Sequence, residues 1–181
     1  MQGHVILSHG FETGPDSTKV TALAAIAERR GWRTSRVDYR DLDARGLAEC
    51  VAPRVERLLH EARPGERTIL AGSSMGAFVS GLASLQTTAD ALFLLALPLQ
   101  IPGFGVFDAA RVPTSLVHGW DDETCPASEV LAFAHEHRAS LLMLPDTHRL
   151  ADHVELIGDH FNAFLRAIET VSDSASLPDV E

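Results

Sequence analysis

Apolar and polar residues along the chain follow two alternating patterns. Short, nearly continuous apolar runs predict buried strands, and longer segments with apolar residues every three or four positions predict helices between them. The predicted strands cover residues 4–8, 34–38, 68–71, 91–95, 114–117 and 140–144. The predicted helices cover residues 17–30, 47–62, 76–85, 127–138 and 152–168. Asp16 is a plausible N-cap of the first helix, and Gly31 ends it.

Strands that alternate with helices are typical of a parallel sheet with helices on both faces and right-handed crossovers. We therefore predict an α/β fold, with a doubly wound, mostly parallel sheet of six strands in the order 2-1-3-4-5-6. In such a sheet the ligand binds beyond the carboxyl ends of the strands where the winding reverses, here between the first and third strands. Residues 97–112 contain several proline and glycine residues, so this stretch is expected to be irregular.

The composition indicates one globular domain. The chain has 181 residues, of which 45% are hydrophobic. We expect a single domain without a cap over residues 1–170 and a flexible acidic tail over residues 171–181. The net charge of −10 argues against a nucleic acid or an anionic membrane as partner, although solubility alone explains an acidic surface.

The cysteines and the apolar runs bear on the cellular location. Cys50 and Cys125 are too few for a disulfide framework, and their spacing does not resemble a metal site. No signal peptide precedes the first predicted strand, and the longest apolar run, residues 91–99, is too short to cross a bilayer. A cytoplasmic location is therefore expected.

Residues 72–76, Gly-Ser-Ser-Met-Gly, form a G-x-S-x-G motif between a predicted strand and a predicted helix. This context is typical of a nucleophile elbow, a sharp turn that holds the central serine, Ser74, beside the positive end of the helix. A serine hydroxyl needs a base to take its proton, and the base needs a third group to hold its tautomer. An acid, Asp122, follows the fifth strand, and His148 follows the sixth, which is the chain order that this type of site requires.

With these residues the chain resembles the α/β-hydrolase superfamily, in particular its small, cap-less, esterase-like members. The resemblance extends from residue 4 to about residue 168 and lacks the first two strands of the full-size fold. An H-G-x-x-D-x-x-x-P segment is matched by His118, Gly119, Asp122 and Pro126. A short D-x-H loop is matched by Asp146 and His148, and an H-G-x loop after the first strand by His9, Gly10 and Phe11.

The resemblance implies a catalytic triad of Ser74, Asp122 and His148. The oxyanion hole of such a site needs two backbone N–H groups, which we assign to Met75 and Phe11. The apolar residues of the stretch 97–107 either form a wall for an acyl group or fill the core beneath the loop. The expected substrate-binding residues are His9, Gly10, Leu97 and Phe104.

Several positions have rivals. Asp121 is the alternative acid, but the spacing from His118 to the following proline favours Asp122. His153 is the alternative base, but a position in the first turn of the last helix favours a solvent-facing side chain. Asp146 is interpreted as a turn residue, with bracing of the histidine loop as the alternative.

The remaining histidines are given structural interpretations. His135 and His137 lack a third partner and an i, i+4 spacing, so a solvated helix face is favoured over a metal site. His160 is expected on the surface, and His118 is expected to pack against or brace the acid loop.

We therefore predict a serine hydrolase that cleaves a small carboxylic ester or thioester through an acyl-enzyme on Ser74, with no metal and no organic cofactor. Its partner would be a small-molecule acyl substrate, and the chain would be a monomer or a homodimer. The alternatives are a non-catalytic binding protein on the same scaffold, or an acyltransferase or peptidase with the same triad. A dinucleotide site is disfavoured because residues 9–14 lack the G-x-G-x-x-G pattern.

Overall fold

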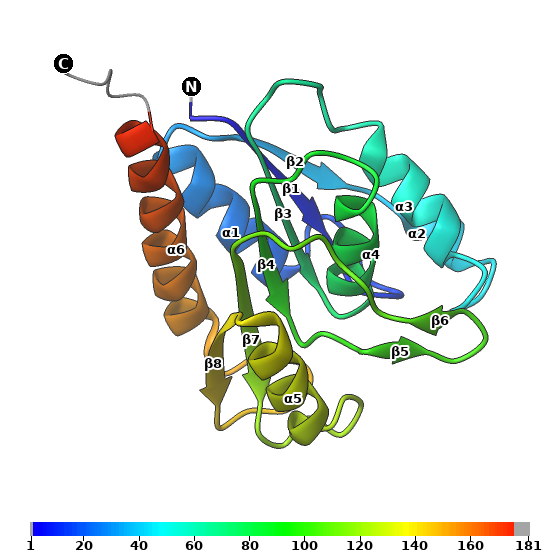
Figure 1. Cartoon of the computed structure of the whole chain (residues 1–181). Helices are drawn as coiled ribbons and strands as arrows, with labels where there is room; N and C mark the ends of the chain where they lie inside the picture. Colours follow the sequence, from blue (N-terminus) through cyan, green and yellow to red (C-terminus); the bar gives the residue numbers. More distant parts are fainter. Residues whose placement is uncertain (1, 176–181) are drawn as a thin grey trace, which may run out of the picture.

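The computed structural model describes the backbone of residues 2–175 and the side chains of residues 2–170. Its main sheet has six parallel strands in the order β2-β1-β3-β4-β7-β8 (Figure 1). This order confirms the predicted topology once the short hairpin β5–β6 is left out of the numbering. The strands are β1 (His4–Ser8), β2 (Arg33–Val37), β3 (Thr68–Ser73), β4 (Ala91–Leu95), β7 (Thr114–Gly119) and β8 (Ser140–Leu144).

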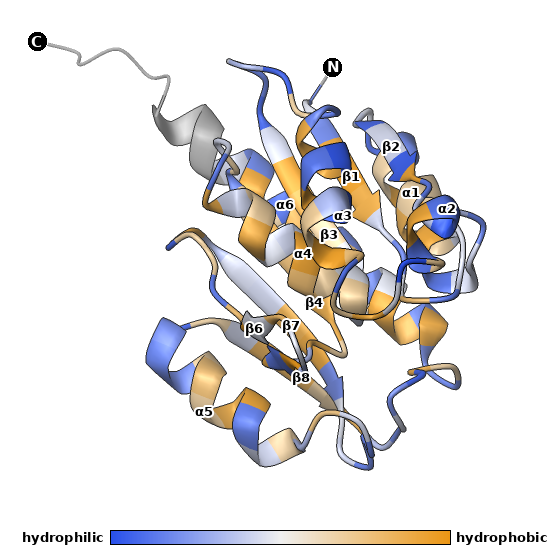
Figure 2. Cartoon of the chain, turned by 90° about the vertical axis from the view of Figure 1, so that its right-hand side faces the viewer, coloured by the Kyte–Doolittle hydropathy of each residue, from blue (hydrophilic) through white to orange (hydrophobic). Residues whose placement is uncertain are grey.

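Helices cover both faces of the sheet (Figure 1). One face packs against α1 (Thr18–Arg29) and α6 (Val154–Ala175), and the other against α3 (Val51–Leu59), α4 (Met75–Ser84) and α5 (Ala127–His137). The alternation of strand side chains divides the core between these layers, because Val5 and Leu7 pack toward α1 and α6 while Ile6 packs toward α3 and α4. Figure 2 shows apolar residues along the central strands, in keeping with strands buried on both faces.

The predicted helix over residues 47–62 is shorter in the structure and is preceded by a separate short helix, α2 (Arg40–Asp43). Proline lacks the N–H donor that a helix interior needs, so Pro53 fits only in the first turn, and α3 begins at Val51. The first helix also differs at its start, since its N-cap is Ser17 rather than Asp16.

The last helix extends further than predicted. The apolar stripe of α6 remains buried through Leu165 and Ile168, and the helix continues to Ala175. Residues 171–175 of the predicted acidic tail are therefore helical, and residues 176–181 lie outside the described residues. No helix within residues 2–175 is long and apolar enough to cross a membrane.

The first and last helices of the fold lie side by side. Trp32, just after α1, donates a hydrogen bond of 2.9 Å from Nε1 to Oε1 of Glu169 in α6. The Arg30 guanidinium forms an ion pair with the same carboxylate. Burial opposes ionisation of Glu169, but these hydrogen bonds outweigh it and hold the pKa of the carboxyl below its usual value.

Residues 97–112 were expected to be irregular, but they contain a two-stranded antiparallel hairpin, β5 (Gln100–Ile101) and β6 (Gly105–Val106). The hairpin follows β4, and its first strand approaches the carboxyl edge of the sheet (Figure 1). This edge also carries the loops after β1, β3, β7 and β8, which hold the candidate site residues.

Candidate active site

Ser74 lies at the turn between β3 and α4, with φ of 55° and ψ of −121°. A positive φ is unfavourable for a residue with a side chain, so the surrounding structure must hold it in place. The Ser74 N–H donates a hydrogen bond of 2.8 Å to the Leu95 carbonyl. A Cβ at Gly72 would lie 2.2 Å from the Gly76 carbonyl oxygen, and a Cβ at Gly76 would lie 2.1 Å from that of Ser8. The turn therefore requires glycine at both positions, as the motif predicts.

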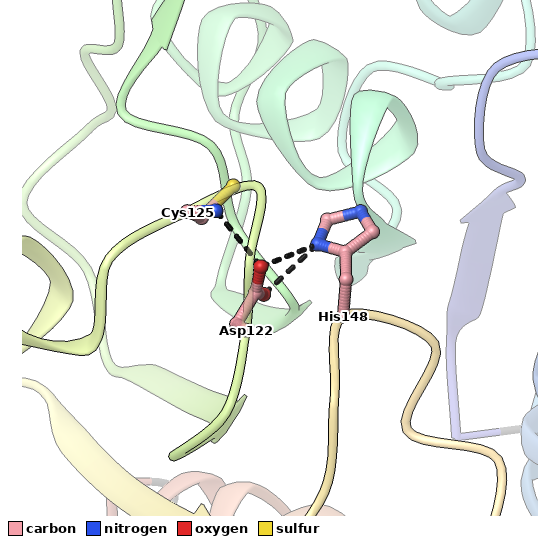
Figure 3. Close-up of side chains that lie close together, drawn as sticks. All are labelled: Asp122, Cys125 and His148. Carbon is pink, nitrogen blue, oxygen red and sulfur yellow. Dashed lines mark hydrogen bonds and ion pairs between the residues drawn. The ribbon is translucent and has the colours of Figure 1, made fainter.

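The side chains of Ser74, His148 and Asp122 form a continuous hydrogen-bonded chain. The distance from Ser74 Oγ to His148 Nε2 is 2.8 Å. On the other side of the ring, His148 Nδ1 lies 3.0 Å from Oδ1 and 2.9 Å from Oδ2 of Asp122 (Figure 3). A carboxylate can only accept, so Nδ1 carries a proton, and Nε2 of the neutral ring is free to accept the proton of the serine.

Asp122 is buried and held by its own loop. The backbone N–H groups of Thr124 and Cys125 donate to Oδ1 at 2.9 Å and 2.8 Å. Burial favours the neutral carboxyl, but the hydrogen bonds from His148 and these N–H groups outweigh it and hold the pKa of Asp122 below its usual value. Asp121, the alternative acid, is exposed, and its backbone N–H donates to the carbonyl of Asp146.

His118 braces this acid loop from beneath. Its ring is fully buried, and Nε2–H donates a hydrogen bond of 2.8 Å to the Cys125 carbonyl, with Oδ2 of Asp122 3.4 Å away. Nδ1 of the same ring has no hydrogen-bond partner within the described residues. This position agrees with our prediction that His118 packs against or braces the acid loop.

His153, the alternative base, pairs with a different acid. Its Nδ1 lies 2.9 Å from Oδ2 of Asp146, and the side chain is 26% exposed, so it is not the free, solvent-facing residue that we expected. Asp146 also accepts from the N–H groups of Thr147 and Asp152, so it braces the histidine loop instead of serving only as a turn residue. Although burial opposes ionisation, these hydrogen bonds lower the pKa of Asp146.

The other histidines lie away from this site. His160 was expected on the surface, but its Nε2 lies 2.8 Å from Ser115 Oγ and its ring packs against Phe93, so burial lowers its pKa. In the sequence, His160 stands in a polar part of α6, and only the structure shows that its ring faces the sheet. His135 is exposed, and His137 stacks on Phe133 with 3.8 Å between the ring centroids.

The thiol of Cys125 lies close to the side chains of Asp122 and His148. One ligand atom from each of Asp122, Cys125 and His148 lies within 4.8 Å of the others, and the three are drawn together in Figure 3. Sequence spacing gave no sign of this cluster. Burial, with the nearby Asp122 charge adding to it, raises the pKa of the Cys125 thiol to about 12. The thiol is therefore protonated at neutral pH, and the carboxylate and imidazole already bind each other, so this donor set fits an Asp–His pair better than a zinc site.

Met75 and Phe11 carry the two backbone amides that we assigned to an oxyanion hole. Within the described residues, the backbone N–H groups of Met75 and Phe11 donate no hydrogen bond. Met75 is the first residue of α4, where helix N–H groups have no intrahelical acceptor. Phe11 follows the His9–Gly10 turn after β1. Both amides are therefore available to a ligand beside Ser74.

His9, which we predicted to bind substrate, lies behind the loop after β1. It is fully buried and lines neither cavity beside Ser74. Its Nδ1–H donates a hydrogen bond of 2.7 Å to the Gly10 carbonyl, and Nε2 accepts one of 3.0 Å from the Tyr39 N–H. The ring thus fixes the loop from inside, and burial lowers its pKa.

Arg54 is a site residue that the sequence analysis missed. Its guanidinium is fully buried and donates to the carbonyls of His9 at 3.0 Å and Gly10 at 3.2 Å. It also forms a buried ion pair with Asp43, including a hydrogen bond of 2.9 Å from Nε to Oδ1. The signal was present in the sequence, because Arg54 falls on the apolar stripe of α3 formed by Val51, Val55 and Leu58.

Two cavities adjoin Ser74, and both are lined by Ser74 and Phe11. The first, of about 540 Å³, also contacts Gly10, Lys19, His148 and Arg149. The second, of about 420 Å³, also contacts apolar residues, namely Leu47, Met75, Pro98, Leu99, Ile101 and Pro102. Gly10 thus lies where the sequence analysis expected it.

Leu97 and Phe104, which we also predicted to bind substrate, line neither of these two cavities. Leu97 is buried in the core, and Phe104 packs edge-on against Phe78 with 5.9 Å between the ring centroids. Phe107 packs against the same ring. Residues 98–102 of this stretch line the second cavity, while Leu97, Phe104 and Phe107 pack against the core.

No protein-family model matches this sequence, and no curated protein matches it. Among solved structures, a candidate hydrolase of the alpha/beta superfamily from Xanthomonas campestris pv. campestris is 46% identical, with a TM-score of 0.87 over 91% of this chain and 99% of that chain. Est1E from Butyrivibrio proteoclasticus is 19% identical, with a TM-score of 0.75 over 92% of this chain and 88% of its own. Mouse alpha/beta hydrolase domain-containing protein 10 is 16% identical, with a TM-score of 0.73 over 93% of this chain and 92% of its own.

Proposed function

The chain belongs to the α/β-hydrolase superfamily, and we propose that it is a serine hydrolase that cleaves a small carboxylic ester or thioester through an acyl-enzyme on Ser74. The observation that carries this proposal is the hydrogen-bonded chain from Ser74 Oγ through His148 to Asp122, at 2.8 Å and 2.9 Å. Such a chain supplies the base that a serine nucleophile needs and the acid that holds the tautomer of the base.

In the first half of the proposed reaction, Ser74 Oγ attacks the carbonyl carbon of the substrate while His148 Nε2 takes the hydroxyl proton. The ring becomes positively charged, and the ionised Asp122 beside Nδ1 stabilises it. The lowered pKa of Asp122 supports this role, because the carboxylate stays charged at neutral pH. His148 then gives the proton to the leaving heteroatom as its bond to the acyl carbon breaks.

Negative charge develops on the carbonyl oxygen during this step. The N–H groups of Met75 and Phe11 have no acceptor within the described part of the chain, and both border the space around Ser74. Donors placed at a developing oxyanion contribute a few kcal/mol each to the lowering of the barrier. In the second half, His148 activates a water molecule that cleaves the acyl-enzyme and restores the Ser74 hydroxyl.

A fluorophosphonate probe tests the proposal, because it reacts only with an activated serine. We expect a covalent adduct on Ser74, located by peptide mass spectrometry, that does not form when the protein is heat-denatured before labelling or when Ser74 is replaced in Ser74→Ala. The rate of ester hydrolysis should fall by about six orders of magnitude in Ser74→Ala and His148→Ala. A folded wild-type protein that neither reacts with the probe nor hydrolyses any ester or thioester would instead favour the non-catalytic binding protein.

A further inference from the structure

The two cavities beside Ser74 differ in which of them contacts the general base. His148 lines the first cavity and not the second, whereas Met75, the proposed oxyanion donor, lines the second and not the first. His148 Nε2 must hand a proton to the leaving heteroatom, so that atom must lie on the His148 side of Ser74. This difference favours the first cavity for the leaving group and leaves the second for the acyl group.

The cavities also differ in charge. Among the described residues, the first cavity is lined by Lys19 and Arg149 and by no carboxylate, although the chain as a whole has a net charge of −10. The second is lined mainly by apolar side chains, with Glu129 as its charged residue. An apolar acyl group fits the second cavity, and a negatively charged leaving group fits the first.

Lys19 is the only lysine of the chain, since the other 14 of its 15 basic residues are arginines. It lies half-buried in the first turn of α1, and its ammonium donates a hydrogen bond to the Arg149 backbone carbonyl. Neither Lys19 nor Arg149 forms an ion pair within the part of the chain that the structure describes. The negative charge of Asp146 favours the charged form of Lys19, but the Asp146 oxygens already accept hydrogen bonds from His153 and two backbone N–H groups.

An anionic ligand most strongly stabilises an ammonium group that is partly removed from water and has no carboxylate partner. Burial lowers the pKa of Lys19, with the Arg149 charge adding to this shift and the Asp146 charge opposing it. The N-terminal end of α1 adds partial positive charge of the same sign, because Ser17 makes no side-chain cap.

We propose that the leaving group of the substrate carries a carboxylate or a phosphate that Lys19 and Arg149 bind, while an apolar acyl group binds in the second cavity. This inference rests on the proposed hydrolysis and specifies its substrate class. In the reaction, the bond from Ser74 Oγ to the acyl carbon forms and the bond to the leaving oxygen or sulfur breaks. The anionic leaving group departs into the first cavity with the proton that His148 took from Ser74.

The test compares butyrate esters of phenols that differ only at one meta substituent: a carboxylate, a phosphate monoester or a neutral carboxamide. We expect wild-type kcat/KM to be higher for an anionic ester than for the neutral one, and the better of the two anions identifies the group. Lys19→Gln should lower the anionic-to-neutral ratio by about tenfold, as expected for a charge-assisted hydrogen bond at a half-buried site. Arg149→Gln should lower it by about threefold, because Arg149 is exposed.

Two matched variants separate charge at this site from other effects. Lys19→Arg keeps the charge and should keep the ratio within about twofold of wild type. Arg29→Gln removes an exposed charge from the opposite end of the same helix and should leave the ratio unchanged. Because Lys19 is the only lysine, reductive methylation, which preserves its charge, should keep the preference, and acetylation should lower it as Lys19→Gln does.

The failure of this inference is distinguishable from failure of the proposed function. Hydrolysis that depends on Ser74 but shows no preference for either anion, with a ratio unchanged in Lys19→Gln, would overturn the inference and leave the hydrolase intact. Absence of any hydrolysis that depends on Ser74, over all three esters and their thioester counterparts, would overturn both.

Discussion

The buried guanidinium of Arg54 donates a hydrogen bond of 3.0 Å to the backbone carbonyl of His9. A second bond, of 3.2 Å, goes to the carbonyl of Gly10. The loop after β1 turns here, and the next residue, Phe11, presents the amide that we assign to the oxyanion hole. An ionic side chain from α3 thus determines the direction of a backbone N–H in a loop more than forty residues earlier.

We expect Arg54→Met to lower the free energy of unfolding by about 3–5 kcal/mol, because it leaves the buried carboxylate of Asp43 without its partner. Chemical denaturation measures this change. The control is Arg57→Met on the same helix, which removes an exposed ion pair with Asp41 and should have a much smaller effect. Equal losses in the two variants would contradict the role of Arg54.

Asp122→Asn should lower kcat for ester hydrolysis by about three to four orders of magnitude while the protein stays folded. An amide in that position can donate to Nδ1 of His148 and so favours the tautomer that cannot take the serine proton. Asp121→Asn is the matched control, since its side chain is exposed, and it should keep near-wild-type activity. Steady-state kinetics with one ester decides the matter, and a severe loss in Asp121→Asn would assign the acid to the other residue.

The positive φ of Ser74 is expected to lower the free energy of unfolding. Two substitutions separate this cost from the catalytic role of the hydroxyl. Ser74→Ala removes Oγ and keeps the strained Cβ, whereas Ser74→Gly removes both. We expect the glycine variant to be more stable than the alanine variant by about 1 kcal/mol, which thermal and chemical unfolding measure, and both to be inactive. A less stable glycine variant would show that this turn stores no strain.

His4 predicts a loss of stability at mildly acidic pH. The ring is fully buried, Nδ1 accepts from Arg33 at 2.8 Å and Nε2–H donates to Ser35 at 2.9 Å, so the folded state holds it neutral. Burial, with the Arg33 charge adding to it, lowers the pKa of His4 to about 4. Between that value and the usual pKa of about 6.5, the unfolded chain binds a proton that the folded chain does not.

The stability that His4 contributes is therefore complete above about pH 6.5 and is lost as the pH falls toward 4. We expect about 2 kcal/mol of the free energy of unfolding to be lost in this way between pH 7 and about pH 4.5. Denaturation curves of wild type and His4→Gln at both pH values isolate the effect, since the variant should lose less stability on acidification. Parallel losses in the two proteins would mean that other groups account for the acid sensitivity.

The sheet and the positions of Ser74, Asp122 and His148 were predictable because their signals are local. Buried parallel strands appear as continuous apolar runs, and the residues that follow them meet at one edge of the sheet. The glycines at 72 and 76 are likewise required by contacts within the turn and with the neighbouring β1.

The residues that line the cavities were less predictable, because side-chain direction in a loop depends on packing against distant elements. Leu97 and Leu99 are both apolar and two positions apart, yet Leu97 is buried in the core and Leu99 lines the second cavity. His160 likewise gave no local sign that it packs against Phe93 of β4. Only Arg54 broke a pattern visible in the sequence, as a charge on an apolar helix stripe.

The side-by-side packing of α1 and α6 has a consequence for synthesis on the ribosome. One face of the sheet, including Val5, Leu7 and Phe93, is covered by helices that are made at opposite ends of the fold. During translation, this apolar face and the apolar stripe of α1 lack the Phe161 and Leu165 side chains until α6 emerges. The nascent chain therefore leaves this apolar face only partly covered until its final helix docks, even though Ser74 and its turn are made much earlier.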